Sequence, residues 1–119
     1  MRKRFYLHTL QWRLNIQTSI TALIIKENSW IAKLAAWKLK ADAVAIVVGK
    51  TVHLHNCKRQ QFLGDKRWVK HELCHIRQFQ EHGFMGFIFK YLLESIKHGY
   101  YNNKYEMEAR QAERDVESL

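Results

Sequence analysis

The chain has 119 residues, no proline and 47% hydrophobic residues, and its formal net charge is +9 at pH 7. This length suits a single domain with a modest core, and the apolar content excludes a disordered chain. No stretch approaches the ~18 apolar residues of a membrane span. The most apolar stretch, "ADAVAIVVGK", is long enough only for a strand.

The start "MRKRFYLHTLQW" is basic, but polar residues interrupt any apolar run after it, so we expect no signal peptide and a cytoplasmic location. Cys57 and Cys74 are then expected to be reduced, and they form no Cys-x-x-Cys pair. Basic residues outnumber acidic ones in residues 1–70, whereas residues 71–119 are slightly acidic. We interpret the basic half as a solvated face in preference to a patch for nucleic acid or anionic lipid, because its charges are mostly scattered.

The first half of the chain predicts one helix after a segment that stays undecided. Residues 5–25 mix β-branched, aromatic and helix-forming residues, which leaves both helix and strand open. Ser29 can cap a helix that runs to about Lys40. Candidates for its apolar stripe are Trp30, Ile31, Leu34, Trp37 and Leu39.

A hairpin is predicted next, in "AVAIVVGKTVHLH". Two β-branched runs are joined by Gly49 and Lys50, which is the signal of a two-residue turn. His53 and His55 share one face of the second strand. We interpret that face as the solvated side of the strand in preference to a ligand pair.

Three helices are predicted in the second half. Asp65 can cap a helix from about Lys66 to His82 that Gly83 closes. The segment "FMGFIFKYLLESIKH" fits a further helix, and Asn102 or Asn103 can cap a last one. Candidates for the buried face of the middle helix are Phe84, Phe87, Ile88, Tyr91, Leu92 and Ile96.

The first of these helices contains "HELCH", a spacing that suits a zinc site. His71 and His75 lie one turn apart on one helix face, so both imidazoles can reach one ion, with Glu72 beside its open position as a general base. His82 is about 10 Å further along the helix axis, too far to share the ion. Cys74 points off the two-histidine face, and we expect it in the core.

A catalytic zinc usually needs a third protein ligand. The last helix offers Glu106 and Glu108 in "YEMEAR", with a complete helix and a turn between them and the histidines. Because side chains two positions apart on a helix point in roughly opposite directions, at most one of these two glutamates is expected to bind the metal ion. We favour Glu106 and expect Glu108 to be a solvated carboxylate.

These motifs resemble those of the gluzincin metallopeptidases, in which HExxH is joined by a glutamate from a later helix. The closest variant reads Glu-x-x-Ala-Asp downstream, matched here by Glu106, Ala109 and then Arg110 in place of the aspartate. Short bacterial proteins with a HEL-x-H-x-x-Q segment are similar over residues 71–78. The resemblance covers about residues 43–113 and does not explain residues 1–28.

The resemblance implies that His71, His75 and Glu106 bind Zn²⁺ and that Glu72 is the catalytic base. It also implies that the hairpin supplies an edge strand for an extended peptide substrate. Arg110 means that the support of the ligands is built differently from the family's. The oxyanion stabiliser stays open among aromatic and histidine residues near the last turn, which packing explains equally well: His98, Tyr100, Tyr101 and Tyr105.

The sequence therefore predicts a single zincin-like domain over residues 1–119, α+β and mainly α, with one hairpin packed against the HExxH helix and two following helices. The expected function is peptide hydrolysis by a zinc-activated water, with a peptide or protein as substrate. One alternative is a catalytically weak or inactive zincin-like domain that acts as a binding or regulatory module. A second is a nucleic-acid-associated protein that uses the basic half.

Overall fold

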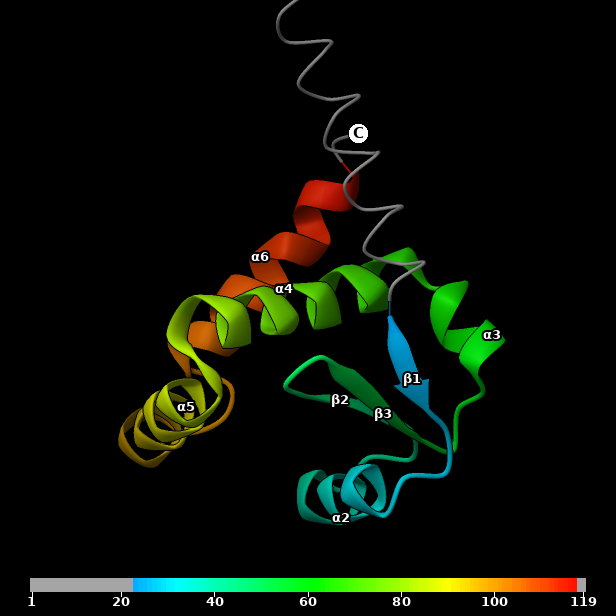
Figure 1. The fold of residues 1–119 in the computed structure, drawn as a ribbon, viewed down its shortest axis with the longest axis horizontal. Coiled ribbons are helices and arrows are strands. Elements are labelled where there is room, and N and C mark those ends of the chain that lie inside the picture. The colour runs from blue at the N-terminus through cyan, green and yellow to red at the C-terminus, as the bar shows by residue number, and fades with distance from the viewer. Residues whose placement is uncertain (1–22, 118–119) are drawn as a thin grey trace, which may run out of the picture.

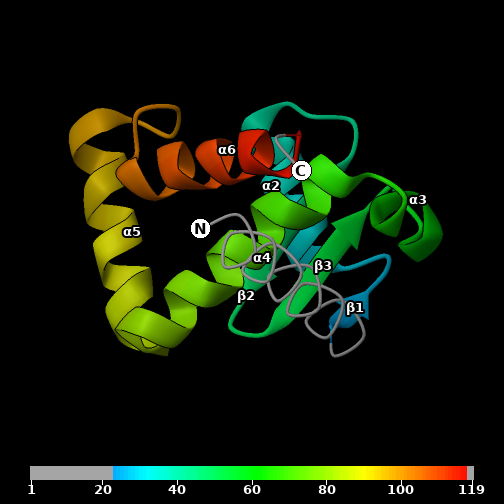
Figure 2. The same cartoon turned by 90° about the horizontal axis from the view of Figure 1, so that it is seen from above.

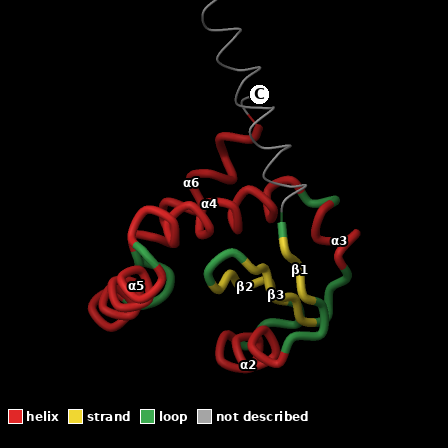
Figure 3. Tube along the Cα trace, in the orientation of Figure 1, coloured by secondary structure: helices red, strands yellow, loops and turns green. Residues whose placement is uncertain are grey.

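The computed structural model of the protein describes residues 23–117, and it combines helices with a small sheet (Figures 1 and 3). The predicted class, α+β and mainly α, is confirmed. Of the undecided segment, residues 5–22 lie outside the described part, as do the basic residues at the start of the chain, whereas Ile24 and Ile25 lie in a strand. None of the described helices is both long and apolar enough to cross a membrane.

The predicted hairpin is present. Strands β2 (Val44–Val48) and β3 (Thr51–His55) pair antiparallel, and the two-residue turn between them contains Gly49 at φ +66°. A third strand, β1 (Ile24–Lys26), pairs parallel with β3, so the sheet order is β1-β3-β2. The expectation of a lone hairpin was therefore incomplete, because a strand of three residues is too short to show an alternating pattern.

Helix α2 (Trp30–Leu39) has the predicted bounds and the predicted N-cap, where the Ser29 hydroxyl accepts a hydrogen bond from the Ile31 amide at 3.2 Å. Its predicted buried stripe is wrong. Ala32 and Ala36 face the sheet and are buried, while Trp30, Leu34, Trp37 and Leu39 are exposed. The helix is apolar on more than one side, so periodicity alone could not tell which side packs.

The sheet is covered on both faces, by α4 (Lys66–His82) on one and α2 on the other (Figure 1). Val52 and Leu54 pack into the main core on the α4 side. His53, which alternates with them, lies on the α2 side, is buried, and has Nδ1 2.7 Å from the Ser29 hydroxyl. The interpretation of this histidine face as solvated was therefore wrong for His53.

Four helices complete the described chain, and three of them were predicted. The unpredicted one is the short α3 (Arg59–Leu63), which buries Phe62 completely. Asp65 caps α4, because its Oδ1 accepts a hydrogen bond from the Trp68 amide at 3.1 Å. Gly83 separates α4 from α5 (Phe84–His98). Helix α6 (Lys104–Glu117) begins after Asn103, whose side-chain oxygen accepts from the Tyr105 amide at 2.8 Å.

Helix α5 connects the end of α4 to the start of α6, and α6 packs along α4 (Figure 2). Of its predicted buried face, Phe87 is buried, and Ile88 and Tyr91 pack partly buried against the core. Phe84, Leu92 and Ile96 are exposed instead. The α4–α6 contact brings the HExxH helix and the last helix together.

Candidate metal centre

The two histidines of "HELCH" point from α4 toward α6, where they meet one carboxylate. Glu106 Oε1 lies 3.1 Å from His71 Nε2 and 3.2 Å from His75 Nε2. Glu106 and His75 are buried, and the two imidazole rings are 5.0 Å apart between centroids. The structure therefore brings together the three residues that were predicted as ligands.

Glu72 completes the cluster. Donor atoms of His71, Glu72 and His75 lie within 4.8 Å of one another, so this group could hold a metal ion. Glu106 adds a further oxygen on the α6 side. Glu72 is buried, and its burial raises its pKa to about 8, against the opposing effect of His75.

The outer nitrogen of each imidazole is also held. Glu113 Oε2 lies 3.2 Å from His71 Nδ1, and Gln78 Oε1 lies 2.8 Å from His75 Nδ1. Histidines that bind metals usually have such a partner, which fixes the tautomer and the orientation of the ring. Both Nε2 atoms are thereby directed toward the same point.

The glutamate is supported as well. The Tyr91 hydroxyl donates a hydrogen bond to Glu106 Oε2. Burial alone would raise the pKa of Glu106, but hydrogen bonds from His71, His75 and Tyr91 outweigh burial and hold that pKa well below its usual range. Burial likewise opposes protonation of the two histidines, yet Glu106 raises the pKa of both. The Glu106 carboxylate therefore favours a positive charge at the two imidazoles beside it.

Two of these supporting residues were missed from the sequence. Glu113 lies seven residues after Glu106, which is two turns along the same face of α6, and this spacing is a signal that could have identified it. Tyr91 was expected only as a core residue, and no local pattern marks its hydroxyl as a partner of Glu106.

Glu108 points away from the centre, as the spacing predicted. Its Oε1 accepts hydrogen bonds from Arg77 at 2.9 Å and from Gln78 Nε2 at 3.1 Å, and its side chain is about half exposed. Cys74 is buried beside it, which confirms the predicted core position. Burial raises the pKa of this thiol to about 12.

Two other residues singled out in the sequence lie apart from the cluster. His82 stacks on Phe87 and contacts Lys90 Nζ at 3.0 Å through Nδ1. Arg110 places its guanidinium 4.1 Å from the centre of the Tyr101 ring and donates to the Tyr101 carbonyl. Arg110 therefore fixes the loop before α6, while Glu113 contacts a histidine of the cluster.

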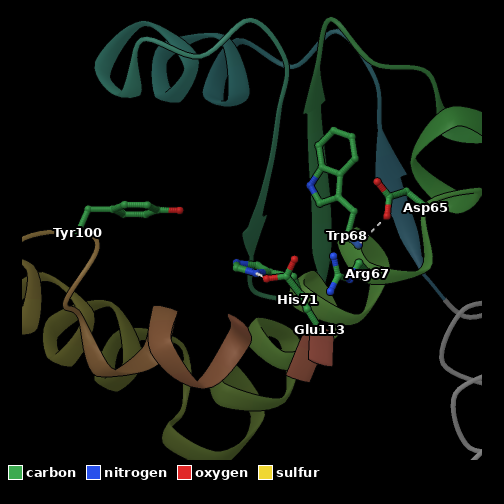
Figure 4. A pocket seen from close by; sticks show the side chains of 6 residues that line it. All are labelled: Asp65, Arg67, Trp68, His71, Tyr100 and Glu113. Atoms are coloured by element: carbon green, nitrogen blue, oxygen red, sulfur yellow. Dashed lines mark hydrogen bonds and ion pairs between the residues drawn. The ribbon is translucent and has the colours of Figure 1, made fainter. Parts of the chain in front are cut away.

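An open pocket of about 350 Å³ lies beside His71 (Figure 4). Tyr100 directs its ring into this space from the opposite side (Figure 4). Partial burial of Tyr100, which is 46% exposed as a whole, and the nearby charges of Glu106 and Glu72 raise the pKa of its hydroxyl, which is therefore a hydrogen-bond donor at neutral pH. The residues that line the pocket are Asp65, Arg67, Trp68, His71, Tyr100 and Glu113.

Strand β2 is an edge strand of the described sheet and contacts α4, the helix that carries His71 and His75. Within the described sheet it pairs only with β3. Its other edge therefore carries backbone groups that are not used by another strand.

A scan of protein-family models and searches of curated proteins and of solved structures found no match for this chain.

Proposed function

We propose that the protein is a zinc-dependent peptidase of gluzincin type. The observation that carries this proposal is the Glu106 carboxylate, which lies 3.1–3.2 Å from the Nε2 atoms of both His71 and His75. Two imidazoles and one carboxylate are a donor set that catalytic zinc sites use, with a fourth position left for water. We assign His71, His75 and Glu106 as the zinc ligands.

Zinc held by these residues would lower the pKa of a water at its open position and polarise the substrate carbonyl. Glu72 follows His71 directly and is buried beside both histidines. The positive charge of a zinc ion beside it would lower the raised pKa of Glu72, so that its carboxylate would take the proton from the attacking water and return it to the amine nitrogen that leaves. Glu72 is therefore the general base and then the general acid.

The outer edge of β2, which pairs with no other strand among residues 23–117, supports an extended peptide as the substrate. A peptide that pairs with this edge gains backbone hydrogen bonds independently of its side chains. The Tyr100 hydroxyl faces the pocket beside His71 and is the group we assign to donate a hydrogen bond to the oxyanion that forms at the scissile carbonyl.

The test compares wild-type protein with Glu72→Gln. We expect about one zinc per chain in both, the same unfolding temperature within a few degrees, and cleavage of a quenched fluorescent peptide library that falls at least about hundredfold in the variant. Glu81→Gln is the matched control, because Glu81 is an exposed carboxylate on the same helix.

Each other outcome points to a different conclusion. Cleavage that persists in Glu72→Gln contradicts the assignment of the base. Zinc without any cleavage in wild-type protein, and no functional effect of Glu72→Gln, identifies a non-catalytic zincin-like module. Protein without zinc, even after incubation with zinc, contradicts the metal site itself.

A further inference from the structure

Two helices of this protein expose apolar side chains in a pattern that the metal centre does not use. Helix α2 directs its two alanines toward the sheet and its large apolar residues outward. Helix α5 is apolar on its core side and also on its outer side. A helix with apolar residues on both its core side and its outer side is normally covered on both, so the exposed outer faces of α2 and α5 suggest a binding partner.

The outer face of α2 has an apolar centre with basic borders. Trp30 is 69% exposed and Trp37 is 76% exposed, and Leu34 lies between them on the same face. At 100° per residue, Lys33 and Lys38 fall on opposite sides of this row, and both are exposed. Tryptophan beside lysine in such a helix is typical of the membrane–water interface.

The outer face of α5 is larger. Its exposed apolar residues recur with helical spacing over residues 85–96 and form one stripe: Met85, Phe89, Leu92, Leu93 and Ile96. Lys90 and Lys97 are exposed along one border of this stripe. In the view of Figure 1, α2 and α5 both lie below α4.

We propose that the outer faces of α2 and α5 form a docking surface for a lipid bilayer that contains anionic lipids. The apolar rows enter the boundary between headgroups and acyl chains, while the bordering lysines contact anionic headgroups. A second copy of this chain fits less well, because two α2 faces in contact would bring Lys33 and Lys38 of both copies together, on a protein whose net charge is already +9. This inference does not depend on zinc or on peptidase activity.

The experiment is flotation of the full chain with vesicles of phosphatidylcholine alone and with vesicles that also contain phosphatidylglycerol. We expect the partition coefficient to be higher for the anionic vesicles and to fall as salt is added. Trp37→Ser should lower it about tenfold, because part of an indole no longer leaves water. Lys38→Gln should lower it about fivefold, the effect of one lysine near an anionic surface.

Two matched controls separate this surface from general stickiness and general charge. Met107→Ser removes an exposed apolar residue of α6, and Lys58→Gln removes an exposed lysine before α3. Both should leave the partition coefficient nearly unchanged. Circular dichroism and the unfolding temperature confirm that each variant is folded.

Three results would overturn the proposal. The first is equal or no binding to the two kinds of vesicle at low salt. The second is binding that Trp37→Ser and Lys38→Gln reduce no more than the controls do. The third is a dimer in sedimentation equilibrium that Trp37→Ser or Phe89→Ser dissociates, without vesicle binding by the wild type, which would assign the surface to a second copy.

Discussion

Replacing Glu106 with glutamine keeps the size of the side chain but exchanges one carboxylate oxygen for an amide nitrogen, which cannot bind zinc. Glu106 is buried and contacts His71, His75 and Tyr91 through its two oxygens. The variant should therefore fold, with a loss of about 1–3 kcal/mol in the free energy of unfolding of the metal-free protein, since hydrogen bonds to a buried charge are weakened.

The effect of zinc separates a ligand from a structural residue. If zinc is added to metal-free wild-type protein at about 100 times its Kd, it stabilises the fold by about 2.7 kcal/mol, which raises Tm by roughly 10 °C for a chain of this size. Loss of a residue that merely supports a ligand costs ten- to hundredfold in affinity, so loss of the ligand should cost at least about hundredfold. At the same zinc concentration, the stabilisation of Glu106→Gln then falls to about 0.4 kcal/mol, a shift of roughly 2 °C.

The assay is thermal unfolding of chelator-treated protein with and without zinc, with each variant compared to its own metal-free form. Glu108→Gln is the matched control, because Glu108 lies two residues away on α6 and contacts Arg77 and Gln78 instead of the histidines. It should keep the full rise in Tm. A full zinc-dependent rise in Glu106→Gln, or its loss in Glu108→Gln, would refute the assignment of Glu106 as the third ligand.

Two further predictions concern histidine partners. Glu113→Ala removes the group beside His71 Nδ1, so zinc affinity measured by chelator competition should fall about ten- to hundredfold with the fold retained; unchanged affinity would show that Glu113 does not support the site. Burial, and then the charge of Lys26, lower the pKa of His53 below 6.5 in the folded protein. As the pH falls, the unfolded chain therefore takes up a proton at this histidine before the folded chain does. The stability that neutral His53 contributes is present above pH 6.5 and is lost as the pH falls below it. His53→Asn should therefore lose less free energy of unfolding than wild type between neutral and mildly acidic pH in urea titrations, and equal losses would contradict this account.

The bounds of the helices could be predicted from the sequence because their ends are determined locally. Ser29, Asp65 and Asn103 each accept a backbone hydrogen bond at a helix start, and Gly83 adopts a positive φ where α4 ends. These interactions involve residues close in sequence, which a short motif can specify. The same holds for the Gly49 turn of the hairpin.

Which face of a helix is buried could not be predicted in the same way. The side chain of Trp37 has a larger apolar surface than that of Ala36, yet Trp37 is exposed and Ala36 is buried. The small side chain of Ala36 lets α2 approach the sheet closely. Strand β1 was missed because its three residues gain their role only from pairing with β3. Both outcomes depend on neighbours distant in sequence, which a local pattern does not contain.

The candidate site shows the same division. The spacing of His71 and His75 on one helix is a local property, so their common direction could be predicted from the sequence. The encounter with Glu106 depends on how α5 turns the chain back, and the spacing suggested it without determining it. The role of Tyr91 follows only from the packed structure, in which its hydroxyl on α5 donates a hydrogen bond to Glu106 on α6.

Helix α6 carries three side chains with defined contacts on one face: Glu106 contacts the histidines, Arg110 contacts Tyr101 in the preceding loop, and Glu113 contacts His71 Nδ1. Ala109 lies among them and is completely buried against its surroundings. Because an α-helix moves as a rigid rod over this length, a bulkier side chain at 109 would displace all three together. We therefore expect that few residues larger than alanine are tolerated at position 109, and that a substitution there disturbs the contacts of Glu106, Arg110 and Glu113 together.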